Sequence, residues 1–208
     1  MTRIARDSVT ASDIPTEGCQ LFGGYVNGRV SQWKESDWER FPKGTTYTID
    51  VLGTVFDADE LDVEVGDPTD TVGFPVTVNW VKKHEGNFLP ILYANRATLT
   101  PMFNALNKAG LYVGKHFLLH IATLDGKTKT VEDMTGVVAV QWKGAAQTGG
   151  HYDESIVYDD AWKRVEPIKP PAPPVVTMET GLLITNGKTT DVPSSRLVTS
   201  RDGGKTWQ

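Results

Sequence analysis

The sequence is poor in residues that build disulfides or metal centres. It contains one cysteine, Cys19, and four histidines among 208 residues. A single cysteine excludes an internal disulfide and a cysteine-rich metal site, so the fold must depend on its apolar core. His116 and His120 have a spacing that suits zinc on a helix, but the residues around them predict a strand, on which they would lie ~13 Å apart. We therefore expect no metal site.

Positive charge and long apolar runs are also scarce. Lys and Arg number 21 against 26 Asp and Glu, which gives a formal net charge of −5. A general nucleic-acid-binding protein needs a positive surface, so we expect no nucleic-acid partner. No apolar run approaches the ~20 residues that cross a bilayer. The opening MTRIARDSVT lacks the apolar segment of a signal peptide. We expect neither a membrane partner nor a signal peptide.

Phosphate-binding motifs are incomplete. Gly-Lys-Thr occurs at 187–189 and at 204–206, but Leu182 and Thr199 stand where a phosphate-binding loop requires its first glycine. The sequence therefore predicts no nucleotide site, and we expect no cofactor.

The composition is typical of a soluble globular domain, with 39% hydrophobic and 23% charged residues. Its largest break is EPIKPPAPPVV, at 166–176, where five prolines predict a stiff extended segment. We predict a main domain at 1–166, a proline-rich linker at 167–175 and a small tail at 176–208.

The tail has too few apolar residues to bury a core of its own. Its SRDGGKTW stretch, at 200–207, resembles the Asp-box of sialidase-type propellers and predicts a β-hairpin turn in which Asp202 bonds the turn amides. We expect the tail to dock on a partner protein, on a second copy of the chain or on the main domain.

The main domain alternates short apolar runs with helix-like stretches. This alternation predicts an α/β fold with a parallel sheet. About seven strands and two or three helices fall short of a full barrel, so we predict a reduced or irregular (β/α) TIM-like barrel, with an open doubly wound sheet as the alternative. The expected strands are 21–28, 46–53, 60–66, 89–95, 115–124, 137–142 and 155–162, and the expected helices are 35–41 (capped by Ser36), 76–86 and 100–110 (capped by Thr100).

Three carboxylates alternate along the stretch ELDVEVGD, at 60–67. Leu61, Val63 and Val65 fit a strand face that packs under helices, which turns Asp62 and Glu64 inward near the end where barrel active sites lie. Two like charges this close raise the pKa of one of them, and a proton donor beside an ionised carboxylate is what glycoside hydrolysis requires. The alternative for this stretch alone is a solvated acidic face.

Two further acids end neighbouring segments. Asp50 closes the expected strand before this one, and Asp153 precedes the last apolar run within GGHYDES. Acids at the ends of several strands are less easily explained as one solvated face, so we expect them at the same rim.

The order VTASDIP, GGYVNG, SDWERF, TIDV, LDVEVGD, PILYAN, VAVQW and GGHYDES resembles glycoside-hydrolase-like domains encoded by phages of actinobacteria. The similarity covers about 1–162, and such domains are similar to family-25 glycoside hydrolases, the muramidases. That family carries its acid on a D-x-E strand, matched here by Asp62-Val63-Glu64. The resemblance implies Glu64 as the general acid and Asp62 as its charged neighbour.

The resemblance assigns further roles around this pair. Asp153 would bind the sugar, and Tyr25, Tyr93 and Trp142 would be its stacking rings. The family bears an essential Asp on its first strand, whereas the first strand expected here, at 21–28, has none. Asp50 is therefore our candidate substitute.

Two functions follow from these expectations. The first is a phage-encoded glycosidase acting on bacterial cell-wall glycan, released to the host wall. The second is a virion protein, most plausibly of the tail, that keeps the hydrolase fold with weak or no activity and assembles with other tail proteins, or with itself, through 167–208.

Overall fold

The computed structural model describes residues 2–28, 32–86, 88–124, 135–158, 182–185 and 188–191. The chain divides into two units, Met1–Pro167 and Ile168–Gln208. The predicted boundaries at 166 and 175 stay predictions, because they fall among residues outside the described ranges, as does the predicted hairpin turn at 200–207.

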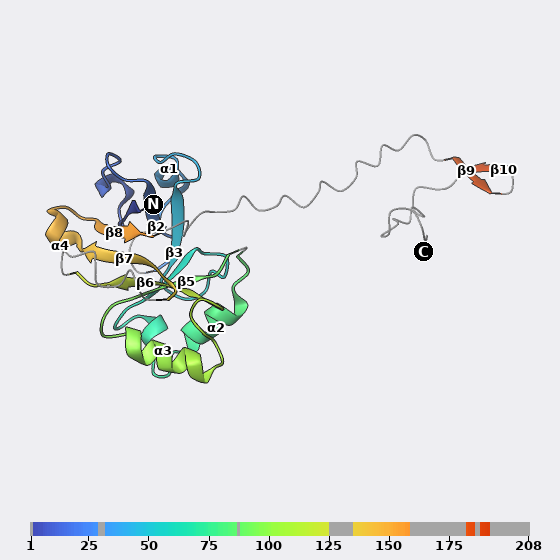
Figure 1. The fold of residues 1–208 in the computed structure, drawn as a ribbon. Coiled ribbons are helices and arrows are strands. Elements are labelled where there is room, and N and C mark those ends of the chain that lie inside the picture. The colour runs from blue at the N-terminus through green and yellow to red at the C-terminus, as the bar shows by residue number, and fades with distance from the viewer. Residues whose placement is uncertain are drawn as a thin grey trace. The chain divides into compact units, whose positions relative to one another are not determined.

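The first unit is an α/β fold built on a closed barrel of eight strands, β1 to β8 in sequence order (Figure 1). Closure excludes the open doubly wound sheet. The strands are β1 (Arg3–Asp7), β2 (Leu21–Tyr25), β3 (Thr46–Asp50), β4 (Glu60–Val63), β5 (Ile91–Ala94), β6 (Leu118–Ala122), β7 (Val137–Lys143) and β8 (Asp153–Val157).

The barrel is mixed, which corrects the expectation of a parallel sheet. Strands β1 to β7 run parallel to their neighbours, but β8 is antiparallel to both β7 and β1. A reversed strand brings its first residue, rather than its last, to the end of the barrel where the other seven strands finish.

The sequence did not predict β1, because only Ile4 and Ala5 of its five residues are apolar. Its outer face carries a charged residue. Arg6 Nε lies 2.9 Å from Glu154 Oε2 on β8, and Lys143 Nζ of β7 lies 3.4 Å from Glu154 Oε1. These largely buried charges are tolerated because they are paired, and Arg6 also donates to the carbonyls of Pro15 and Glu17.

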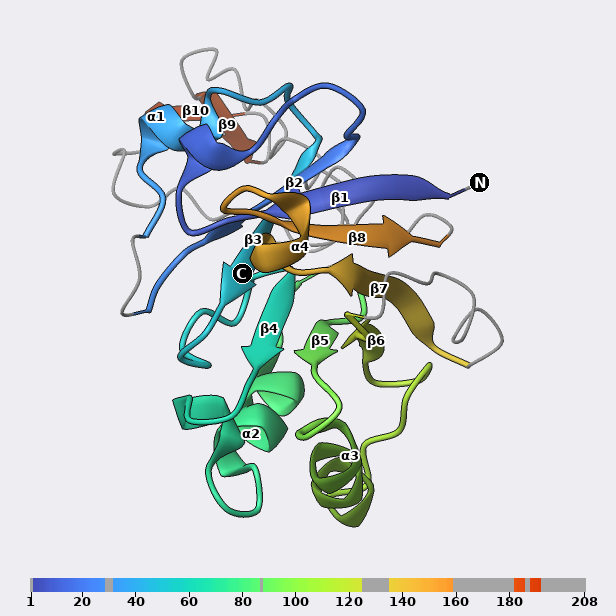
Figure 2. The ribbon, with the colours of Figure 1, turned by 90° about the vertical axis from the view of Figure 1, so that its left-hand side faces the viewer.

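Helices cover the barrel unevenly. Figure 2 shows α2 (Pro75–Lys83) and α3 (Leu99–Lys108) side by side below β4 and β5. Leu61 and Val63 of β4 are fully buried in the core that these helices share with the barrel, as the alternation predicted. Val65 is 66% exposed, because the strand ends at Val63. The shorter elements are η1 (Ala11–Asp13), α1 (Glu35–Trp38), η2 (Pro68–Asp70) and α4 (Ala145–Thr148).

The expected helix caps are shifted. Helix α1 begins after Lys34, so Ser36 lies inside it, and α3 begins after Thr98 rather than Thr100. Gly110 follows α3 with φ +79°, the left-handed conformation expected after a helix end.

The lower interior of the barrel is a packed apolar layer. Its buried members are Ala5, Leu21, Tyr47, Ile49, Ile91, Ala139 and Val157. This layer fills the part of the barrel interior away from the pocket, and Ile49 reaches from it to the pocket wall.

In the second unit the structure describes β9 (Leu182–Thr185) paired antiparallel with β10 (Lys188–Asp191). Among the described residues of either unit, no helix has the length and apolar character needed to span a bilayer.

Candidate active site

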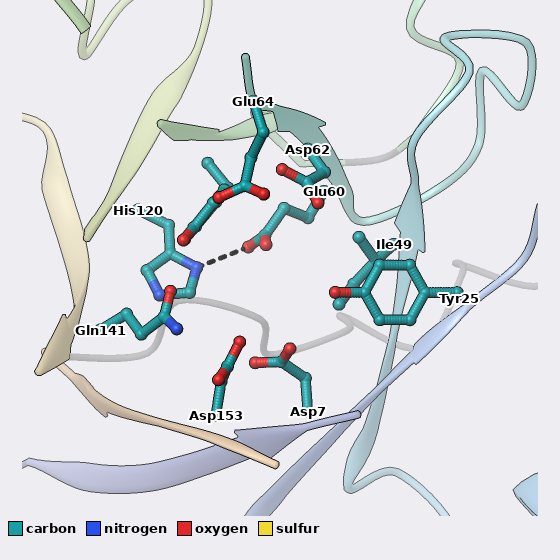
Figure 3. Close-up of a pocket in the computed structure, with 10 residues that line it drawn as sticks. Asp7, Tyr25, Ile49, Glu60, Asp62, Glu64, His120, Gln141 and Asp153 are labelled. Carbon is teal, nitrogen blue, oxygen red and sulfur yellow. Dashed lines mark hydrogen bonds and ion pairs between the residues drawn. The ribbon is translucent and has the colours of Figure 1, made fainter. Parts of the chain in front are cut away.

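A pocket opens where β1 to β7 end and β8 begins (Figure 3). We call its five carboxyl groups the acidic mouth: Asp7, Glu60, Asp62, Glu64 and Asp153. Its cavity volume is about 40 Å³, which holds roughly three water molecules and is far below the ~300 Å³ at which small-molecule sites begin. The other lining residues are Tyr25, Ile49, Tyr93, His120 and Gln141.

Asp7 and Asp153 form a cross-strand pair in this mouth. They are direct partners in the antiparallel register of β1 and β8, as the last residue of one strand and the first of the other. Burial raises the pKa of Asp7 well above its usual range, and the charges of Asp153 and Glu60 raise it further, against hydrogen bonds from Tyr47 and Tyr25. Two acids so placed do not both ionise easily.

The environment of Asp153 is more polar. Burial raises its pKa, while hydrogen bonds from the Ala145 N–H and the Gln141 side chain, and the charge of His120, oppose that rise. Asp153 is therefore better placed than Asp7 to carry the negative charge of the pair.

Asp62 is the most isolated acid of the mouth. Its side chain points into the pocket (Figure 3), the residue is 8% exposed, and its Oδ1 is buried without a hydrogen-bond partner. Burial, and then the charges of Glu64 and Glu60, raise the pKa of Asp62 well above its usual range. An unpaired buried carboxylate oxygen is costly, which is typical of a functional site rather than of a structural one.

Glu64 follows β4 directly and is only half-buried. Burial raises its pKa, and hydrogen bonds from the side chains of Tyr93 and Asn95 partly oppose this. Glu64 thus combines access to the pocket opening with retention of its proton to a higher pH than an ordinary glutamate.

From the pocket wall inward, three buried side chains, of Glu60, His120 and Ser155, form a line across the barrel. His120 Nδ1 lies 3.0 Å from Glu60 Oε2, and His120 Nε2 lies 2.9 Å from Ser155 Oγ. They come from β4, β6 and β8, as expected for a barrel layer built from alternate strands. Ser155 is fully buried and does not line the pocket, so the line is a support for the mouth and not a nucleophilic triad.

Of the residues predicted to stack on sugar, Tyr25 and Tyr93 line the pocket and Trp142 does not. Strand alternation explains the difference: Gln141 faces inward, and Trp142 faces outward, with Lys143 Nζ 3.8 Å from its ring centroid. Burial raises the pKa of both tyrosines, so their hydroxyls stay protonated and can donate hydrogen bonds.

The structure does not bring Asp50 to the mouth. Because Ile49 faces the pocket, the next residue of β3 faces away, and Asp50 is fully buried outside the barrel. Its oxygens accept hydrogen bonds of 2.7–3.1 Å from the side chains of Asn27 and Trp80 and from the N–H groups of Leu52, Gly53 and Val55. Asp50 thus organises the loop after β3.

Asp7 occupies the position on the first strand at which the resembling family carries an acid. The true first strand lies upstream of the expected one, and it ends in Asp7. The available signal was an acid at the end of the alternating stretch RIARD. Glu60 and His120 were also missed as pocket residues, although Glu60 belongs to the same strand face as Asp62.

Carboxyl groups with raised pKa values beside others that ionise can move a proton and stabilise positive charge. Within the described ranges, no three His, Cys, Asp or Glu side chains have the geometry to hold a metal ion. Comparison with protein-family models, with curated proteins and with solved structures gives no match to this chain. The chemistry of the acidic mouth is therefore the main guide to function.

Proposed function

We propose that this chain is a phage-encoded glycosidase-like protein that acts on bacterial cell-wall glycan, with Glu64 as its general acid. The supporting observation is that carboxyl groups from β1, β4 and β8 converge on one pocket while burial raises the pKa of four of them. The motif resemblance to family-25 glycoside hydrolases supports the same reaction class.

Glu64 and Asp153 are the two half-buried members with a raised pKa. Glu64 is assigned as the acid because Asp153 is paired with Asp7 and is the member better placed to ionise. Glu64 gives its proton to the glycosidic oxygen as the bond from that oxygen to the anomeric carbon breaks. The family resemblance assigns to Asp62, in its ionised form, the stabilisation of the positive charge that develops on the sugar ring. Burial and the neighbouring acids favour its protonated form, so this role requires Asp62 to lose its proton as the positive charge develops. Water then bonds to the anomeric carbon and passes its proton to the Asp7–Asp153 pair, whose ionised member acts as base.

The saccharide sits above the cavity rather than inside it, since about 40 Å³ does not enclose a sugar ring. Tyr93 donates a hydrogen bond to Glu64. The ring of Tyr93 also packs against the ring of His120, with 5.0 Å between their centroids, so Tyr93 holds the Glu64 side chain in place. Tyr25 flanks the opening from β2.

The test is release of reducing ends from purified bacterial peptidoglycan by the full chain. Glu64→Gln keeps the shape of the side chain but cannot supply the proton, so we expect a loss of 100-fold or more in rate. Glu85→Gln, at an exposed glutamate outside the pocket, is the matched control and should retain full activity. If wild-type protein with a native melting curve releases no reducing ends, the enzymatic function is wrong.

The narrow cavity also favours a second candidate, a virion tail protein that keeps the fold with weak or no activity. Under this proposal residues 167–208 bind other tail proteins or a second copy of the chain. Deleting 167–208 should abolish incorporation into virions while the barrel still folds. Normal incorporation of the shortened chain would overturn this role.

A further inference from the structure

We propose that the floor of the acidic mouth binds a primary ammonium group, so that the preferred glycan carries a free amino sugar rather than an N-acetylated one. The glycan part of this inference rests on the proposed function, whereas ammonium binding needs no catalysis.

The first observation is an excess of acidic over basic groups. Five carboxyl groups line the pocket, and His120 is the only basic side chain among its lining residues. His120 is already 3.0 Å from Glu60. A cationic ligand would therefore supply the positive charge that lets more of these acids ionise.

The second observation is an acceptor without a donor. Asp62 Oδ1 is buried in the floor with no partner, and Asp62 is more than nine-tenths buried. The neighbouring donors already form hydrogen bonds with other acids. Tyr25 donates to Asp7, Tyr93 donates to Glu64, and Gln141 donates to Asp153. A group that fills this place must bring N–H or O–H donors of its own.

The size and polarity of the floor select among such groups. An ammonium presents three donors and no acceptor, and it occupies about as much space as one of the roughly three waters that the cavity of about 40 Å³ can hold. An acetamido group adds three heavy atoms, one of them a carbonyl oxygen that would face carboxylates. The floor therefore fits the amine and disfavours the acetamide.

Proton release is an independent signature of this mode of binding. The titratable groups around Asp62 come from several parts of the chain. They are Asp7 and Tyr25 from β1 and β2, Glu60 from its own strand, Glu64 and Asp67 from the segment after it, Tyr93 from β5, His120 from β6 and Asp153 from β8. Because burial and like charges favour the protonated acids, a bound cation should drive protons into the buffer.

The experiment is calorimetric titration of the full chain with a β-1,4-linked glucosamine tetrasaccharide and with its fully N-acetylated counterpart, at pH 6 in two buffers of different ionisation enthalpy. We expect the amine form to bind at least tenfold more tightly and to release protons. Asp62→Asn should weaken its binding at least tenfold, whereas Asp57→Asn, at an exposed aspartate, should leave it unchanged.

Equal or weaker binding of the amine form, or no effect of Asp62→Asn, would overturn the inference. So would complete displacement of the amine by equimolar calcium, since the site would then be a divalent-metal site. Peptidoglycan cleavage is assayed separately: amine preference without cleavage would overturn the proposed enzymatic function alone, and cleavage without amine preference would overturn this inference alone.

Discussion

Asp7 lies directly opposite Asp153 on two antiparallel strands, while the adjacent pair, Arg6 and Glu154, has opposite charges. The acid pair faces the pocket, and the ion pair faces away from it. The same two strands thus carry a stabilising pair on one face and a repelling pair on the other. Like charges placed opposite one another are destabilising, which is expected where an acidic site is built at the expense of stability.

Asp7→Asn should stabilise the protein at high pH. The pKa of Asp7 is raised in the folded state, so the folded chain holds a proton that the unfolded chain loses, and the free energy of unfolding falls as pH rises through that window. Because asparagine does not ionise, the Asp7→Asn variant should lack this decrease in the free energy of unfolding. We expect a gain of up to ~1 kcal/mol at pH 8 and none at pH 3.5, measured by urea denaturation. Asp57→Asn, at an exposed site, should show neither effect, and a gain at pH 3.5 that matches the one at pH 8 would contradict this account.

Asp50→Asn should destabilise the fold without touching the mouth. In the variant, an amide NH₂ group would replace one carboxylate oxygen. The backbone N–H groups that donate to that oxygen in the wild-type protein would then face a second donor. Hydrogen bonds to charged groups contribute ~1.5–3 kcal/mol each, so we expect a loss of about 3 kcal/mol in chemical denaturation. Asp57→Asn is again the control. A variant as stable as wild type would show that the network around Asp50 contributes little.

Ser155→Ala should weaken the buried line of Glu60, His120 and Ser155. It removes the hydroxyl 2.9 Å from His120 Nε2, and loss of a buried partner costs ~1–3 kcal/mol. Ser36→Ala, at an exposed position of α1, should change the melting temperature little. Equal melting temperatures for the two variants would refute a supporting role for the line.

Gly24→Ala should displace Trp33. A methyl group at Gly24 would come within 2.3 Å of the Trp33 ring, and Trp33 Nε1 donates to the Ser8 carbonyl at 2.9 Å. Such overpacking costs ~1–3 kcal/mol. Gly144→Ala is a fair comparison, because its nearest neighbour would be 3.5 Å away and its φ is −90°. Comparable thermal stability of both variants would contradict the packing argument.

Alternation within single strands carried the successful predictions. Glu60, Asp62 and Glu64 share one face because Leu61 and Val63 are buried on the other. The same rule, applied to Ile49 or to Gln141, would have turned Asp50 and Trp142 away from the pocket. The predictions for Asp50 and Trp142 rest on strand position and on the family resemblance, and neither takes account of which side of the strand a residue faces.

Two features of the barrel could not be predicted from the sequence, because they depend on pairing between distant segments. Strand β1 has a charged residue on its outer face, so its local pattern is weak, and it is defined by neighbours on both sides. The reversal of β8 is likewise a property of the assembled barrel. Both features were needed to place Asp7 next to Asp153.

Since β1 and β8 stand at opposite ends of the domain sequence, the pairing of Asp7 with Asp153 joins residues 146 positions apart. Closing so long a loop is entropically expensive and is favoured only once the intervening strands have formed. Affinity for a ligand at this spot would then arise in the last stage of chain assembly, and the time course of its acquisition during refolding would report directly on ring closure.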